Sequence, residues 1–210
     1  MEASDLFSKK LRIQTGRLLL RKITLADASD MFEYASKPET TEYLLWEPHP
    51  SYSYTAELIR HLQRGYSDGR YFDFALELKQ TGKMIGTAGF TSLDLKNNTG
   101  EAGYVINPSF RNNGFATEAL SAIINIAFMT LRLNRLEAKY IDGNFASLRV
   151  MKKCGMQFEG ILRQKMLVKG RYRDIGICSL LREEYLAKPR ESIVCEHTFF
   201  GCLSGLFHKN

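Results

Sequence analysis

The stretch RNNGFATEAL, residues 111–120, constrains the fold more than any other part of the chain, because a polar turn runs directly into an apolar helix. The segment EAGYVIN before it predicts a strand that ends at Pro108, since proline cannot donate to a strand ladder. Apolar residues then recur at helical spacing from Ala116 to Leu131. A strand, a turn with Gly114 and a helix therefore follow one another, and the first amides of such a helix lack partners within it.

Open amides at a helix N-terminus favour an anion, because the helix dipole adds positive potential at that end. Gly114 has no side chain to block a close approach, and Arg111, Asn112 and Asn113 supply donors around it. The pattern is neither the P-loop nor the three-glycine dinucleotide motif. By itself the turn is compatible with a phosphate site or with an ordinary turn before a helix.

The hydrophobic patterns along the rest of the chain predict an α/β domain. We expect strands at residues 17–23, 71–78, 84–90, 101–107 and 135–141, and a closing hairpin at 158–167 and 173–185. We expect helices at residues 24–36, 55–69, 115–131 and 144–154, with a structured loop at 37–54.

Length and composition indicate one soluble domain. The 210 residues suffice for one buried core, so we expect an N-terminal extension at 1–14, the domain at 15–188 and a tail of unassigned role at 189–210. No run approaches the roughly 20 apolar residues that span a bilayer, and the start lacks signal-peptide features, so a cytoplasmic protein that does not bind membranes is predicted. The four cysteines are scattered without a histidine cluster, which predicts reduced thiols and no metal site. The net charge of +6 favours an anionic partner.

Several ordered motifs resemble the GCN5-related N-acetyltransferase (GNAT) superfamily. Arg111, Gly114 and Ala116 match its pyrophosphate-binding pattern, Arg/Gln-x-x-Gly-x-Gly/Ala. Downstream, NFASLRVMKKCGMQFEGILR resembles the branch that acetylates the N-terminal amines of ribosomal proteins, with Met156 in place of the usual aromatic residue. The residues that match this second pattern are Asn144, Ser147, Gly155, Glu159 and Gly160. Together with TGRLLLRKITLADA and GEAGYVINPSF, the resemblance covers about residues 15–185.

The resemblance implies the GNAT fold, a mixed and mostly antiparallel sheet that is splayed in the middle and has helices on both faces. It also implies acetyl-CoA as co-substrate, held in the splay without a metal. The pyrophosphate would bind the amides of residues 112–117, and the pantetheine arm would pair with the strand before the turn. The residues expected to bind acetyl-CoA are Val105, Ile106, Asn107, Arg111, Asn112, Asn113, Gly114, Phe115, Ala116, Thr117, Asn144, Ser147 and Lys152.

Acyl transfer to an amine requires a base, an oxyanion donor and an acid near the leaving thiolate. By resemblance, Glu101 is the candidate base, the N–H near Val105 or Ile106 is the oxyanion donor, and Ser147 donates to the sulfur. The residues themselves leave other roles open. Glu101 suits a solvated carboxylate beside a turn, Ser147 suits a serine that bonds the backbone in a first helical turn, and Asn144 suits an N-cap.

The acceptor is less constrained than the cofactor, because loops form its walls. Trp46 and Tyr172 are the expected wall residues, although Trp46 equally suits an anchor between its loop and the core. The leading hypothesis is an enzyme that acetylates the N-terminal α-amine of a protein, of the ribosomal-protein type, in a ternary complex. The alternatives are a small amine acceptor (a polyamine, an aminoglycoside or an amino-acid derivative) and a non-catalytic coenzyme A sensor. No direct nucleic-acid binding is expected, and both a monomer and a homodimer are compatible with the sequence.

Overall fold

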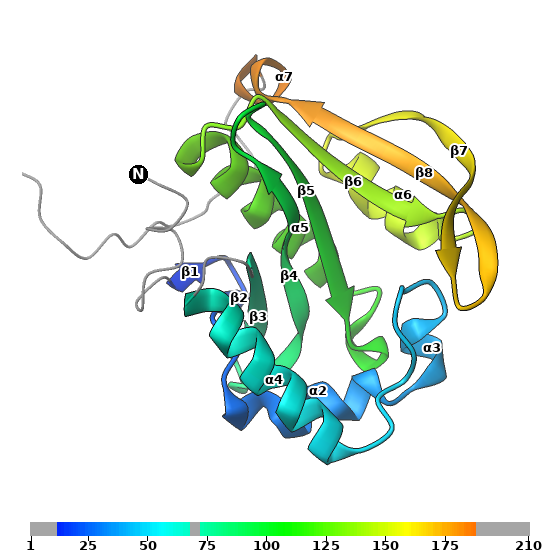
Figure 1. Ribbon diagram of the computed structural model, residues 1–210. Helices are drawn as coiled ribbons and strands as arrows, with labels where there is room; N and C mark the ends of the chain where they lie inside the picture. Colours follow the sequence, from blue (N-terminus) through cyan, green and yellow to red (C-terminus); the bar gives the residue numbers. More distant parts are fainter. Residues whose placement is uncertain (1–11, 68–71, 188–210) are drawn as a thin grey trace, which may run out of the picture.

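An eight-stranded sheet in the order β1-β2-β3-β4-β5-β6-β8-β7 forms the centre of the molecule (Figure 1). The protein is seen in a computed structural model that describes residues 12–67 and 72–187. Neighbouring strands are antiparallel except β5 and β6, which are parallel. The strands are β1 (Arg12–Gln14), β2 (Leu18–Arg21), β3 (Phe72–Leu78), β4 (Met84–Asp94), β5 (Thr99–Ile106), β6 (Arg135–Ile141), β7 (Gln157–Val168) and β8 (Arg171–Leu181).

Helices lie on both faces of this sheet (Figure 1). On one face are α2 (Ala28–Ala35) and α4 (Tyr52–Ser67), and on the other are α5 (Phe115–Asn125) and α6 (Phe145–Lys153). The mixed, mostly antiparallel sheet with helices on both faces is the predicted fold, which is confirmed. The shorter helical segments are η1 (Leu25–Asp27), α3 (Pro38–Thr41), η2 (Pro108–Phe110), the π-helical turn η3 (Ile126–Thr130) and α7 (Arg182–Ala187).

The hydrophobic core is centred on β3, β4 and the helices that cover them. The alternation expected for β3 places Phe74 and Leu76 at 0% exposure, and Met84 and Ile85 on β4 are equally buried. Large apolar side chains of this kind each contribute about 1.5–3 kcal/mol when fully buried. The core therefore makes this half of the sheet a rigid support for the strands beside it.

The parallel pair β5 and β6 separates part of the way along its length. The two strands pair only from Thr99 to Ala102 on β5 and from Arg135 to Ala138 on β6. Beyond that point β5 stays paired with β4 as far as Ile106, whereas β6 stays paired with β8. The strands consequently diverge toward their C-terminal ends, which is the splay that the resemblance implied (Figure 1).

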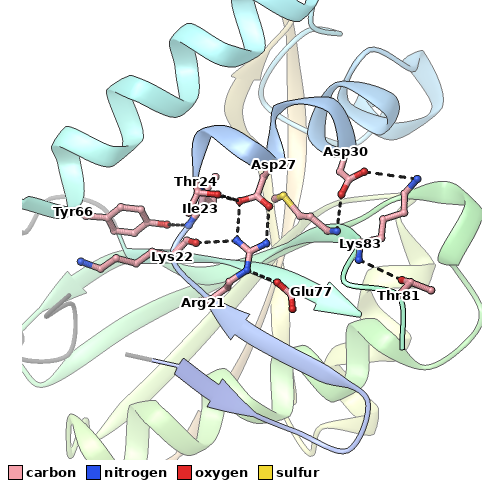
Figure 2. A network of polar contacts seen from close by, with 11 residues as sticks. Arg21, Lys22, Ile23, Thr24, Asp27, Asp30, Tyr66, Glu77, Thr81 and Lys83 are labelled. Atoms are coloured by element: carbon pink, nitrogen blue, oxygen red, sulfur yellow. Dashed lines mark hydrogen bonds and ion pairs between the residues drawn. The ribbon is translucent and has the colours of Figure 1, made fainter. Parts of the chain in front are cut away.

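A buried ion network joins β2 to the first helical segments (Figure 2). The Arg21 guanidinium donates to the two carboxylate oxygens of Asp27 at 2.8 and 2.6 Å, and to Glu77 on β3 at 2.5 Å. Asp27 also accepts from the N–H of Thr24 at 2.7 Å, as part of a capping box. These bonds fix the angle at which the chain leaves β2 for η1 and α2.

Three segments differ from the sequence expectations. Residues 182–185 belong to α7 rather than to the last strand, because the Glu184 carboxylate accepts from the N–H of Leu181 at 2.9 Å and caps that helix. The loop 37–54 contains α3, which starts at Pro38, a residue whose φ suits a first helical turn. Strand β1 pairs with β2 within the segment expected as an N-terminal extension. The tail expected at 189–210 lies outside the described residues.

Candidate active site

Two adjoining cavities open where β5 and β6 separate. We call the first, of about 400 Å³, the helix-mouth cavity, because residues 114–117 at the start of α5 line it. We call the second, of about 510 Å³, the aromatic cavity, because Tyr34, Trp46 and Tyr54 are among its lining residues. The residues that line both cavities are Tyr43, Leu44, Tyr104, Val105, Asn144 and Ser147. A group transferred between two bound molecules would cross at these residues.

The start of α5 provides the open amides that the sequence predicted. Gly114 has a φ of 80°, a left-handed conformation that glycine adopts readily, and no side chain caps this helix. The first N–H with an acceptor in the helix belongs to Glu118, which donates to the carbonyl of Gly114 at 3.0 Å. The N–H groups of Phe115, Ala116 and Thr117 therefore have no acceptor within α5 and stand at the end of the helix dipole.

Arg17 stabilises the turn before α5 from outside the cavity. No sequence pattern indicated this role. Its guanidinium donates to Glu118 at 2.8 Å and to the carbonyl of Asn113 at 2.8 Å, and it lies 4.4 Å above the Phe115 ring. Glu118 also accepts from the backbone N–H of Arg17 at 2.7 Å. The turn is thus held by a residue roughly a hundred positions earlier in the chain.

The edge of β5 that faces the splay has free backbone groups. Asn107 donates its N–H to the Ile85 carbonyl at 2.8 Å, and the register pairs Val105 with Thr87. Because the bonds of an antiparallel strand alternate in direction, the N–H groups of Tyr104 and Ile106 point away from β4. They face β6, which no longer pairs at that level. Of the two expected oxyanion donors, Ile106 therefore has the suitable direction and Val105 does not.

A tyrosine that the sequence analysis did not select bridges the splay. The Tyr104 hydroxyl lies 2.7 Å from the hydroxyl of Ser147 and 3.1 Å from its carbonyl, so β5 and α6 are joined through these two residues. Burial raises the pKa of Tyr104, which keeps its hydroxyl protonated at neutral pH. Asn144 is the N-cap of α6 and accepts from the N–H of Ser147 at 3.2 Å. The capping role was one of the two roles left open for Asn144.

Glu101 lines the aromatic cavity from β5, on the strand face opposite to Tyr104. Its carboxylate forms an ion pair with Lys139 on β6 at 2.5 Å, and its side chain is 23% exposed. It is therefore neither fully solvated nor deeply buried. Asp73 is the other carboxylate in the lining of this cavity.

The loop between α3 and α4 supplies an aromatic wall. Trp46 lies 5.1 Å, between ring centroids, from His49, and His49 lies 5.1 Å from Tyr54. His49 is buried and its Nδ1 is 2.8 Å from the Thr55 hydroxyl. Burial lowers the pKa of His49, so this ring is neutral at pH 7. Trp46 both lines the cavity and packs against the core, which joins the two roles considered for it.

Four expected site residues do not line either cavity. Asn107 is buried and its amide donates to Glu33 at 2.9 Å, while Asn113 folds its side chain onto the carbonyls of its own turn. Lys152 is exposed, whereas its neighbour Lys153 lines the helix-mouth cavity. Tyr172 is 66% exposed on β8. The remaining expected residues line a cavity: Trp46, Glu101, Val105, Ile106, Arg111, Asn112, Gly114, Phe115, Ala116, Thr117, Asn144 and Ser147.

The described residues contain neither a metal cluster nor a membrane-spanning helix. Among residues 12–67 and 72–187, no three His, Cys, Asp or Glu side chains are grouped so that they could hold a metal ion. In the same part of the chain, no helix combines the length and the apolar content needed to cross a bilayer.

Comparison with known families identifies the family of the chain. A family model described as an acetyltransferase (GNAT) domain matches residues 17–157, which is more than half of the chain. The chain belongs to the GNAT family. This acetyltransferase is 36% identical over 173 residues to the N-acetyltransferase p20 of Bacillus licheniformis, and the alignment covers 82% of this chain and 97% of that protein.

More distant relatives differ in their acceptors. The acetyltransferase is 26% identical to the ribosomal protein uS5 alanine N-acetyltransferase of Escherichia coli, over 84% of this chain and 93% of that protein. It is 23% identical to the spermidine N(1)-acetyltransferase of Vibrio cholerae, over 81% of this chain and 96% of that protein. The protein is thus an N-acetyltransferase of a family that uses acetyl-CoA, and its relatives include enzymes for protein and for small amine acceptors.

Solved structures show the same fold. A GNAT-family acetyltransferase from Bacillus anthracis superposes with a TM-score of 0.73 at 27% identity, covering 83% of this chain and 100% of that one. A spermidine N-acetyltransferase from Vibrio cholerae, solved in complex with CoA and spermine, superposes with a TM-score of 0.70 at 22% identity, covering 81% and 98%.

Proposed function

We propose that this acetyltransferase acts on the N-terminal α-amine of a polypeptide. The observation that carries the proposal is the lining of the aromatic cavity. Among the residues that the structure describes, those in its lining that carry charge are Asp73, Glu101 and Lys139, and Lys139 is paired with Glu101. A polyamine with three or four positive charges would require more carboxylates to replace its hydration, whereas a single terminal amine requires few. Aromatic and apolar walls also suit the side chain of a terminal residue.

In this proposal acetyl-CoA occupies the helix-mouth cavity. Its pyrophosphate is attracted to the amides of residues 115–117, where the helix dipole and Arg111 add positive potential. Arg149 and Lys153 line the same cavity and can approach the remaining phosphate. The free edge of β5 pairs with the pantetheine arm as a neighbouring strand would, through the N–H and carbonyl of Tyr104 and the carbonyl of Ile106, which leaves the N–H of Ile106 for the acetyl group.

The chemistry then takes place where the two cavities meet. The neutral amine forms a bond to the thioester carbon, the N–H of Ile106 stabilises the oxyanion, and the carbon–sulfur bond breaks as the amide forms. Glu101 receives the proton from the amine, directly or through water. Ser147, hydrogen-bonded to Tyr104, gives its proton to the thiolate of coenzyme A and regains one from Tyr104 or from solvent.

A second candidate is a small amine acceptor. It is supported by the similarity to a spermidine acetyltransferase, and it would use the same cofactor site. The lining of the aromatic cavity is the feature that disfavours a polycation. The two acceptor classes differ in the molecule that becomes labelled, so one assay separates them.

The test is coenzyme A release from acetyl-CoA with peptides that begin with Ala, Ser or Met, with whole ribosomal proteins, with polyamines and with aminoglycosides. Mass spectrometry locates the acetyl group. We expect labelling at the α-amine of peptides. Labelling confined to polyamines or aminoglycosides would replace this proposal with the second candidate.

The role of Glu101 is tested by Glu101→Gln. Loss of the base should lower kcat by about 100-fold and change its pH dependence, while calorimetric affinity for acetyl-CoA is retained. The matched control is Glu137→Gln, because Glu137 lies directly beside Glu101 in the parallel register but lines neither cavity. Equal rates in both variants would show that another group or water alone takes the proton.

The placement of the pyrophosphate is tested by Gly114→Glu. A carboxylate at the helix mouth should weaken acetyl-CoA binding by at least about tenfold, or about 1.4 kcal/mol, because it repels the phosphates. Gly82→Glu is the control for backbone strain, since Gly82 has a similar φ of 72° with open space around it. Calorimetric titration with acetyl-CoA measures the affinity of both folded variants. Equal affinities would contradict the placement of the pyrophosphate at the start of α5.

A further inference from the structure

The end of the β7–β8 hairpin carries a concentration of positive charge that the reaction does not use. Within residues 163–173, five of the eleven residues are Lys or Arg and none is acidic. Four of them are exposed, and Arg173 is partly exposed. Because the net charge of the whole chain is only +6, this hairpin is a local excess of positive charge rather than a sample of the average surface.

One of these cations has a structural role. Lys169 donates to the carbonyl of Thr41 at 2.7 Å and lies 3.6 Å from Glu47, which joins the hairpin to the α3 segment (Figure 1). The other four have no carboxylate within 4.0 Å among residues 12–67 and 72–187. We call Arg163, Lys165, Arg171 and Arg173 the basic hairpin.

The basic hairpin begins at the aromatic cavity. Met166 and Ile175 line that cavity, and Arg173 is paired with Met166 in the ladder. Residues alternate across a strand, so Arg171 and Arg173 share a face of β8 with Ile175. Ile175 lies four positions after Arg171 on β8, or about 13 Å at 3.3 Å per residue. An extended acceptor chain that leaves the cavity would reach these cations within about four residues.

We infer that Arg171 and Arg173, the cations of the basic hairpin that share a face with the cavity wall, bind acidic side chains at about the third to sixth positions of the polypeptide acceptor. The inference rests on the proposed function, because it assumes that a chain emerges from the aromatic cavity. The surface is positively charged, so it favours carboxylates. Because the hairpin is continuous with the cavity wall, these carboxylates would belong to the acceptor chain that leaves the cavity. The cavity then accepts the terminal residue, and the hairpin selects the residues that come after it in the acceptor chain.

The test compares three ten-residue peptides that share their first two residues and differ at positions three to six, which are Asp/Glu, Asn/Gln or Lys. At low salt we expect KM for the acidic peptide to be about fivefold below that of the neutral one, as two exposed ion pairs would give, with kcat little changed. The difference should shrink as salt is raised, because exposed charges are screened.

Arg171→Glu should remove the preference for the acidic peptide and lower KM for the Lys peptide. Lys96→Glu is the control, because it makes the same change in net charge at an exposed turn between β4 and β5 that lines neither cavity. An identical shift in both variants would overturn the inference in favour of a general charge effect.

The remaining outcomes separate this inference from the proposed function. Acetylation of all three peptides with equal KM would overturn the inference and leave the function in place. If no peptide is acetylated while spermidine is, the proposed function fails and the inference falls with it. Inhibition by a polyuridine competitor that Arg171→Glu relieves, without any discrimination among peptides, would assign the hairpin to phosphate binding and overturn the inference.

Discussion

Two arginine-centred networks, one in each half of the sheet, show how differently the halves are built. Arg21 binds Asp27 and Glu77 with side-chain exposures of 16%, 5% and 21%. Arg135 binds Glu159 and Glu137 in the same way, but the exposures are 24%, 42% and 31%. Both networks pair one arginine with two carboxylates, but the side chains of the second network are more exposed to solvent.

The difference arises from the helices. The network of Arg21 lies beneath η1 and α2, as Figure 2 shows. The described helices leave one face of β6, β8 and β7 open (Figure 1). The side chains of the Arg135 network, at 24% to 42% exposure, are more accessible to solvent than those of the Arg21 network. The covered half is therefore a rigid support, and the open half is suited to contact with a partner. The site lies at the junction between them.

The largest expected contrast concerns two phenylalanines. Phe74 on β3 is 0% exposed and Phe158 on β7 is 45% exposed. Phe74→Ala should lower the free energy of unfolding by about 3–5 kcal/mol, because it leaves a cavity in a close-packed core. Phe158→Ala should cost about 1 kcal/mol or less, as most partly exposed substitutions do. Urea unfolding at pH 7 measures both, and similar losses would show that β7 is covered in solution.

The two networks give the next contrast. Asp27→Asn should cost about 3 kcal/mol at pH 7, because it leaves a largely buried guanidinium with one carboxylate fewer. Glu159→Gln should cost about 0.5 kcal/mol, the value of an exposed pair screened by solvent. Equal costs would mean that the open face is buried in solution, for example by a second copy of the chain.

The pH dependence of stability should separate the same two variants. Burial acts to raise the pKa of Asp27, but bonds from Arg21 and Thr24 outweigh it and hold that pKa below its usual range. Bonds from Arg135 and Ser179 lower the pKa of Glu159 to about 2. A lowered folded-state pKa gives stability that is present above the unfolded-state pKa, near 4, and is lost as the pH falls. Asp27→Asn and Glu159→Gln should therefore each flatten the loss of stability as the pH falls below about 4, and the effect should extend to lower pH at Glu159, whose folded-state pKa is about 2.

The smallest contrast in stability is expected at the junction, where Tyr104 joins the halves. Tyr104→Phe removes the hydroxyl that bonds Ser147 but keeps the ring, so stability should change by about 1 kcal/mol. If Ser147 and Tyr104 together supply the proton for the coenzyme A thiolate, Tyr104→Phe should lower kcat by about tenfold or more and leave the affinity for acetyl-CoA unchanged. Ser147→Ala in the same assay should give a similar decrease, and combining the two should add little. An unchanged kcat would restrict Tyr104 to packing.

The sequence predicted much of the covered half, because local patterns dominate there. The period of two in residues 72–78 determined β3, and the polar turn at Gly114 determined the mouth of α5. Both depend on a few neighbouring residues. The prediction was wrong for residues 182–185, where a strand-like run became α7 because Glu184 caps the chain after Leu181. That competition between a strand and a capped helix is not visible from hydrophobic pattern alone.

Sequence alone thus determined the family motifs, the open amides of α5 and the N-cap at Asn144, since each depends on residues within a few positions. Tertiary structure alone decided the brace by Arg17, the pairing of Tyr104 with Ser147 and the ion pair of Glu101 with Lys139. Their partners are 101, 43 and 38 positions apart, so these contacts depend on the path of the whole chain. The splay also depends on the path of the whole chain. Where the pairing between β5 and β6 ends, β5 remains paired with β4 and β6 remains paired with β8.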